Sequence, residues 1–164
     1  MLISERFSMK EKMTIILFSG DLDKAIAAFT LATTAAASGM DVSIFFTYWG
    51  LNVLKRTTFT ISKSQNFLQK MFNIMSSARL PISKLNMFGL GPWIMKKLMK
   101  KTKMAPLEDL MKLAKELGVK YIACTTSCSF FGVTKETLIA DVNEFAGAST
   151  YLAEAKDSKI NLFI

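Results

Sequence analysis

The stretch Leu-Gly-Val-Lys-Tyr-Ile-Ala-Cys, residues 117–124, decides the fold. Its first two residues end a helical pattern, and the six that follow are typical of a buried strand that finishes at Cys124. A helix directly before a strand indicates a parallel sheet, because crossover helices connect parallel strands. Such sheets bind their ligands outside the carboxyl ends of the strands. Cys124, followed by a predicted polar loop over 125–129, therefore lies where chemistry is expected.

Other apolar runs predict further strands of the same sheet. They cover residues 13–18, 42–47 and 160–164. Continuous rather than alternating apolar runs indicate strands that are buried on both faces, as in parallel sheets. We expect a fifth strand in the middle of the chain, with residues 57–61 as the candidate. These strands predict an α/β fold, a three-layer α/β/α sandwich on a parallel sheet of about five strands.

Capping residues place the helices between these strands. Asp21 is expected to begin a small-residue helix that ends at Gly39, and Pro106 another that ends at Gly118. Thr134 is expected to cap a helix that runs from about Lys135 towards Gly147. The remaining predicted helices cover residues 66–75 and 93–101 and the segment after Gly147.

Length and composition indicate one domain over residues 1–164, with a basic, irregular and helical middle section at 52–105. Two cysteines are too few for a disulfide framework, and the charged first dozen residues do not match a secretory signal. We therefore expect a cytoplasmic protein with free thiols. Residues 25–40 carry no charge, but they are rich in Ala and Thr and interrupted by Ser38-Gly39, which favours a packed helix over a membrane span.

Basic charge is concentrated in the middle of the chain. The whole chain has a net charge of +8, and between Val42 and Leu107 there are eleven Lys or Arg residues and no Asp or Glu. The densest part, residues 93–104, combines Lys96, Lys97 and further lysines with an apolar, Met-rich face. Three interpretations stay open: a solvated helix face, a docking surface for an acidic protein or anionic membrane, and a nucleic-acid contact. The last is disfavoured because no nucleic-acid-binding motif accompanies the lysines.

The chain contains no histidine, which excludes Ser-His-Asp and Cys-His catalysis and histidine metal ligands. Two cysteines cannot form a four-ligand zinc site, and the segment Ser19-Gly20-Asp21 lacks the glycine spacing of a dinucleotide site. We expect no metal and no cofactor. The chemistry that remains is that of the Cys124 thiol, whose alternative role is that of a small buried apolar residue.

Three other residues are candidates near this thiol. Cys128 could resolve an adduct on Cys124, although the four-residue spacing differs from a CxxC redox motif. Tyr48 and Trp49 follow the second strand and could line the same crevice, or else pack in the core.

The order and spacing of three stretches resemble the DsrE/DsrF-like family, in the branch described as peroxiredoxin-like or as DsrE-related sulfur carriers. The first stretch opens at Ile15 and contains Ser19-Gly20-Asp21, and the second comprises 45–51 with 80–89 and the lysine-rich helix. The third runs from Leu117 through Cys124 to Gly132. The peroxiredoxin label itself is not supported, because the Pro-x-x-x-Thr-x-x-Cys arrangement is missing.

The resemblance implies a five-stranded parallel sheet and a cysteine, at the position of Cys124, that holds a sulfane sulfur as a persulfide or thiosulfate adduct. It also implies a protein or small sulfur compound as donor or acceptor, and a homo- or hetero-oligomer, trimeric or hexameric, of which we expect the homo-oligomer. Residues placed with Cys124 as tentative binding residues are Ser19, Gly20, Tyr48, Trp49, Cys128, Lys96 and Lys97. The lysines would lower the pKa of the thiol, from this subunit or a neighbouring one.

Three functions follow as hypotheses. The first is a sulfur carrier or sulfurtransferase that acts through Cys124. The second is a non-enzymatic interaction module that docks through its basic Met-rich helix on an acidic partner or an anionic membrane surface. The third is a small-molecule pocket beneath Trp49 with no covalent step. Solvent access to Cys124 distinguishes the first from the other two.

Overall fold

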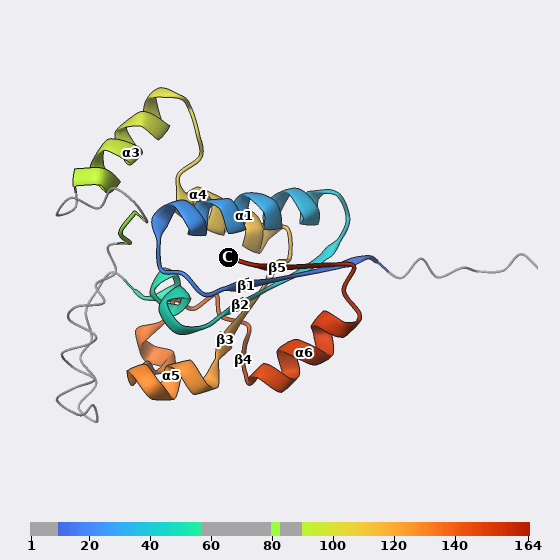
Figure 1. The fold of residues 1–164 in the computed structure, drawn as a ribbon. Coiled ribbons are helices and arrows are strands. Elements are labelled where there is room, and N and C mark those ends of the chain that lie inside the picture. The colour runs from blue at the N-terminus through green and yellow to red at the C-terminus, as the bar shows by residue number, and fades with distance from the viewer. Residues whose placement is uncertain (1–9, 57–79, 83–89) are drawn as a thin grey trace, which may run out of the picture.

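Five parallel strands form one sheet in the order β4-β3-β2-β1-β5 (Figure 1). The computed structural model describes residues 10–56, 80–82 and 90–164. The strands are β1 (Lys12–Leu17), β2 (Asp41–Phe46), β3 (Lys120–Cys124), β4 (Glu144–Ala146) and β5 (Ile160–Phe163). The α-helices are α1 (Leu22–Ala37), α3 (Leu90–Lys101), α4 (Leu107–Glu116), α5 (Thr125–Phe131) and α6 (Ala148–Lys156), with 3-10 helices at Tyr48–Leu54 and Lys135–Thr137. The predicted α/β/α sandwich on a parallel sheet is confirmed.

Helices cover both faces of the sheet, α1 and α4 on one side and α5 and α6 on the other (Figure 1). Successive strand residues point to opposite faces. Tyr121 and Ala123 of β3 thus belong to the main core beneath α1 and α4. Ile122 and Cys124 belong to a second, smaller core with Tyr151 of α6. The side chain of Cys124 therefore lies on the α6 face of the sheet.

Helix α1 packs closely on the sheet because its buried side is built from small residues. Ala25, Ala28 and Ala32 are fully buried there. The helix ends where Gly39 adopts a φ of +88°, a left-handed conformation that glycine takes without steric cost. None of the helices in the described part of the chain has the length and hydrophobicity needed to span a lipid bilayer.

Two predictions about the C-terminal half are wrong. Residues 125–129 form the start of α5 rather than a loop, since Cys124 is both the end of β3 and the N-cap of the helix. The helix expected from Lys135 towards Gly147 is a single 3-10 turn followed by β4. Strand β4 is held in register by Asn143, whose N–H donates to the carbonyl of Tyr121 at 2.9 Å and whose side-chain oxygen accepts from the Tyr121 N–H at 2.8 Å.

The middle section is described only in part. The strand predicted at 57–61 and the helix predicted at 66–75 lie outside the described residues. The fifth strand of the sheet is β4, which lies in a segment predicted to be helical. The helix expected over 93–101 is present as α3, and the helix after Pro106 as α4.

Candidate functional site

The carboxyl ends of β1, β2 and β3 lie side by side, and the segments that follow them pack together. The N–H of Thr47 donates to the carbonyl of Leu17 at 3.1 Å, and the N–H of Gly50 donates to the carbonyl of Phe18 at 2.9 Å. A Cβ atom at position 50 would lie 1.9 Å from the Leu17 oxygen, so only glycine allows this approach. The edge predicted to hold the site is therefore a closely packed junction.

Cys124 occupies the predicted place at the end of β3, but its side chain is not open to solvent. Only 5% of its surface is exposed. Phe45, Ala146 and Tyr151 surround it within the smaller core. The expectation of an exposed thiol is wrong because β4 adds a strand beside β3 and α6 follows it, so that Cys124 is covered from the outer edge of the sheet.

Polar groups surround the buried thiol. The hydroxyl groups of Thr47 and Ser127 lie 2.9 Å apart, and the Ser127 oxygen accepts a hydrogen bond from the N–H of Tyr48 at 3.0 Å. Burial by itself raises the pKa of Cys124. Hydrogen bonds from the side chain and N–H of Ser127, the side chain of Thr47 and the N–H of Thr126 outweigh it, so the pKa lies below its ordinary value of 9.0. Among the described residues, hydroxyls and backbone amides are thus the groups that stabilise the thiolate.

Cys128 lies one helical turn further along α5 in a different environment. Its side chain is buried in the main core, and both cysteines are free thiols. Burial, followed by the charge of Cys124, raises the pKa of Cys128 to about 11. Because the thiolate is the nucleophilic form, Cys128 is the less reactive of the two at neutral pH.

The structure brings Ser19, Gly20, Tyr48 and Trp49 together at the same edge. A Cβ atom at Gly20 would lie 2.7 Å from the Trp49 carbonyl oxygen, and the Ser19 hydroxyl donates to Asp21 at 2.8 Å. The Tyr48 ring lies 5.2 Å from Phe18, and the Trp49 ring 5.1 Å from Phe131. Tyr48 reaches the surroundings of the thiol through its backbone N–H, which bonds to Ser127.

Lys96 and Lys97 lie elsewhere in this chain. They belong to α3, whose Met99 packs into the main core with Leu22 of α1, whereas Cys124 faces α6. The groups that lower the pKa of Cys124 within the described residues are hydroxyls and backbone amides. The idea that these lysines lower it within one subunit is therefore replaced by the hydrogen bonds from Thr47, Thr126 and Ser127.

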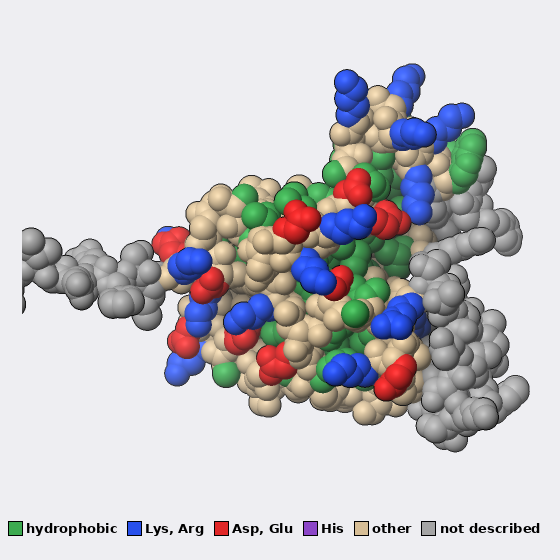
Figure 2. Space-filling view, turned by 180° about the vertical axis from the view of Figure 1, so that it is seen from behind, with side chains coloured by type: hydrophobic (Ala, Val, Ile, Leu, Met, Phe, Trp, Pro, Cys, Tyr) green, Lys and Arg blue, Asp and Glu red, His purple; other side chains and the backbone are tan. Residues whose placement is uncertain are grey.

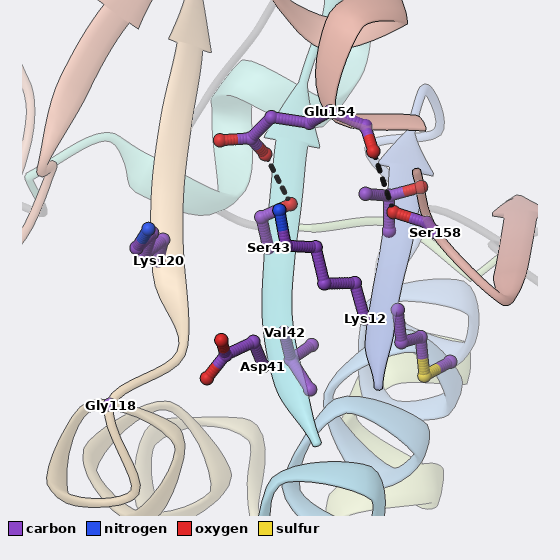
Figure 3. A pocket seen from close by; sticks show the side chains of 10 residues that line it. Lys12, Asp41, Val42, Ser43, Gly118, Lys120, Glu154 and Ser158 are labelled. Atoms are coloured by element: carbon purple, nitrogen blue, oxygen red, sulfur yellow. Dashed lines mark hydrogen bonds between the residues drawn. The ribbon is translucent and has the colours of Figure 1, made fainter. Parts of the chain in front are cut away.

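A separate hollow lies at the opposite, amino edge of the sheet (Figure 3). Lys12, Asp41 and Lys120 line it, and the Ser43 hydroxyl donates to Glu154 at 2.8 Å. Its volume is about 70 Å³, far below the range of about 300–1,000 Å³ that small-molecule pockets occupy. The hollow is therefore too small for an ordinary small-molecule ligand.

Thr47 and Ser127 were not among the site residues predicted from the sequence. Strands β2 and β3 pair in parallel with Phe46 opposite Ala123, so the residue after Phe46 lies beside Cys124. That neighbourhood follows once β2 and β3 are known to be adjacent, which the sequence did not establish. Ser127 was assigned to a loop, and only a helix starting at Thr125 turns its hydroxyl back towards the strand end.

Comparisons with known proteins agree with this architecture. A sequence model of the DsrE/DsrF/DrsH-like family matches residues 9–163. The chain belongs to this family. As a DsrE/DsrF/DrsH-like protein it is similar to the "Uncharacterized protein YrkE" of Bacillus subtilis (strain 168), 41% identical over 157 residues, covering 94% of this chain and 97% of that protein. It is also similar to the "Sulfur carrier protein DsrE2" of Allochromatium vinosum, 36% identical over 163 residues, covering 94% of this chain and 99% of that protein.

Solved structures share the fold of this DsrE/DsrF/DrsH-like chain at low sequence identity. The ychN protein of E. coli superposes with a TM-score of 0.57 at 10% identity, covering 95% of this chain and all of that one. The protein of unknown function MTH1491 of Methanobacterium thermoautotrophicum gives a TM-score of 0.53 at 10% identity, covering 94% of this chain and all of that one. At this identity the likeness concerns the fold alone.

Proposed function

We propose that this protein is a sulfur carrier of the sulfurtransferase type, which holds a sulfane sulfur as a persulfide on Cys124 and passes it to a partner. The observation that carries the proposal is the set of hydrogen bonds that lowers the pKa of this thiol at the end of β3 despite its burial. The relative named as a sulfur carrier supports it. The thiolate is the reactive form of cysteine, and this site favours it.

The chemistry is a balanced transfer of one sulfur atom. The Cys124 thiolate attacks the outer sulfur of a donor persulfide, R–S–SH. A new S–S bond forms on Cys124, the donor's S–S bond breaks, and the donor leaves as the thiolate R–S⁻. With thiosulfate as donor the same attack releases sulfite. A thiol of the acceptor then removes the outer sulfur and regenerates Cys124.

By solvent access alone, a sulfur that is 5% exposed favours the two hypotheses without a covalent step; the lowered pKa of Cys124 and the relative named as a sulfur carrier favour this one. The transfer therefore requires that the donor reach a buried sulfur. The cover includes Ala146 of β4 and Tyr151 of α6. Strand β4 has three residues and lies at the edge of the sheet, where it pairs with β3 on one side. Short edge elements open at lower free energy than central strands. We propose that displacement of β4 and the start of α6 admits the donor.

Mass spectrometry of the intact protein tests the proposal. After incubation with a polysulfide or thiosulfate and removal of excess reagent, the parent protein is expected to gain about 32 Da, the mass of one sulfur atom added by exchange. Cys124→Ser is expected to lose this species, and Cys128→Ser, the matched control, to retain it. Equal loading of Cys124→Ser and the parent would reject the assignment.

We also propose that the protein works in the cytoplasm as a homo-oligomer, a trimer or hexamer, with a sulfur donor or acceptor protein as partner. An exposed aromatic cluster supports association. The Phe18 ring lies between those of Tyr48 and Phe163, 5.2 Å and 5.7 Å away, and Phe163 is 69% exposed at the edge strand β5. Light scattering of the parent and of Phe163→Ser tests this, because a monomeric parent would exclude the oligomer.

A further inference from the structure

Helix α3 projects beyond the layer formed by α1 and α4 (Figure 1). Met99 anchors it in the main core with 6% of its surface exposed, and Met95, one turn earlier, packs against the same core. These two residues form the half of the apolar stripe of α3 that is covered by the rest of the protein. The contact with the rest of the protein fixes which side of α3 faces outward.

The other half of the stripe is uncovered. Trp93 is 59% exposed, Ile94 50% and Leu98 58%. Ile94 and Leu98 are four residues apart and therefore lie on the same side of the helix, one turn apart. Single exposed apolar residues are common on protein surfaces, but neighbouring large ones on one short helix indicate an interaction site.

Lysines flank these apolar residues. The ammonium group of Lys97 lies 5.1 Å from the centre of the Trp93 ring. Lys100 and Lys101 lie in the last turn of the helix. Figure 2 shows Lys and Arg side chains gathered over this projection. Among the described residues, the ion pair that these lysines make joins Lys96 to Glu108 at 4.0 Å, between two exposed side chains. The charge of α3 is thus largely uncompensated by the described part of the chain.

We propose that the outward face of α3, comprising Trp93, Ile94, Lys97, Leu98 and Lys101, docks the protein peripherally on an anionic lipid bilayer. A basic helix with Trp, Ile and Leu on its open side has the composition of interfacial helices. The lysines contact lipid phosphates, and the three apolar side chains enter the boundary between headgroups and acyl chains. A lipid surface satisfies both groups along the whole helix. This contact does not require Cys124, which faces the other side of the sheet.

Vesicle flotation tests the proposal with the full-length protein. The parent is expected to float with phosphatidylcholine vesicles that contain phosphatidylglycerol, and not with pure phosphatidylcholine. Binding is expected to be lost towards about 1 M salt, where the Debye length is about 3 Å. The double variant Lys97→Ser/Leu98→Ser is expected to bind at least about fivefold more weakly, since one lysine near an anionic surface accounts for roughly fivefold and the loss of Leu98 removes apolar surface from the contact as well.

A matched control removes the same residue types from another exposed helix face. Lys112→Ser/Leu113→Ser on α4 is expected to float like the parent, and so is Cys124→Ser. In a Trp49→Phe background Trp93 is the remaining tryptophan, and its emission is expected to shift to shorter wavelength with anionic vesicles. Equal loss of binding in both double variants would overturn the proposal. If the parent does not bind vesicles but does bind polyglutamate, the proposal is overturned, and an acidic protein is the partner of α3 instead.

Discussion

The hydroxyl groups of Thr47 and Ser127 lie 2.9 Å apart and join the end of β2 to the first turn of α5. Each hydroxyl can alternatively donate its single proton to the sulfur of Cys124, and these hydrogen bonds lower the pKa of the thiol. Ser127 is 3% exposed, so its hydroxyl is a structural link and a thiolate donor at once. The reactivity of Cys124 is therefore coupled to the packing of two neighbouring strand ends.

Replacing Ser127 by Ala is expected to raise the pKa of Cys124, because the substitution removes the strongest of the hydrogen bonds that lower it. It should also cost roughly 1–2 kcal/mol of stability, since the Tyr48 N–H loses its partner. The pH dependence of iodoacetamide labelling and urea unfolding measure the two effects. Ser149→Ala, which changes an exposed serine of α6, serves as control. An unchanged labelling profile in Ser127→Ala would contradict the assigned hydrogen bond.

Labelling of the two cysteines in the folded parent is expected to follow different pH profiles. The pKa of Cys124 lies below 9.0, whereas that of Cys128 is about 11, so Cys124 should react at lower pH. Peptide mapping after timed iodoacetamide exposure measures both rates. Identical profiles would mean that both thiols react through global unfolding, which would argue against local access to Cys124.

Lys55 is expected to make stability depend on pH. Burial lowers its pKa from 10.5 to about 8, so the folded protein disfavours the charged lysine. Above 10.5 the lysine is neutral in both states. Between 10.5 and about 8 the unfolded chain binds the proton first, and the folded state loses stability as the pH falls.

Lys55→Met should therefore gain stability relative to the parent as the pH is lowered from 10.5 to about 8, and the gain should level off below that. Urea unfolding across this range measures it. Lys135→Met removes an exposed lysine of the neighbouring 3-10 helix and controls for the change in net charge. A gain that is independent of pH, or equal in the control, would show that burial of Lys55 is not its cause.

Gly50→Ala is expected to cost about 3 kcal/mol or more, at the upper end for single substitutions. Its Cβ atom would lie 1.9 Å from the backbone oxygen of Leu17, and neither backbone can move without breaking the junction at the carboxyl edge. Gly147→Ala is the matched control, because its nearest contact would be an ordinary 3.8 Å. Thermal unfolding compares the two, and equal melting temperatures would show that the junction tolerates a side chain.

The sheet could be predicted largely from sequence because β1, β2 and β3 are continuous apolar runs that end in polar segments. Strand β4 could not, since Glu144-Phe145-Ala146 is too short for an apolar pattern, and its pairing depends on Asn143 bonding to Tyr121. For the same reason the cover over Cys124 was not foreseen. The solvent exposure of Cys124 depends on tertiary structure, and the unpredicted edge strand β4 buries it.

The location of the candidate site could be predicted from the sequence, but the residues that surround Cys124 could not. The position of Cys124 after its strand follows from local sequence, whereas its hydrogen bonds come from Thr47, far away in the chain, and from Ser127 in an unpredicted helix. The lysines that the sequence suggested for this task lie on α3, across the sheet. The density of lysines in the sequence correctly indicated an exposed basic surface. Which side chains lie next to the sulfur of Cys124 depends on the order of the strands in the sheet.

Strand β5 pairs with β1 across almost the whole sequence, with Met13 opposite Ile160. Contacts between residues so distant along the chain form slowly. The entropy of closing the long loop between them is lost before the hydrogen bonds between β1 and β5 stabilise the pairing. We expect β5 to join a sheet whose inner strands are already in place. Its amide hydrogens should then exchange with solvent sooner than those of β2, and the flank of β1 would be the surface most exposed to mispairing during refolding.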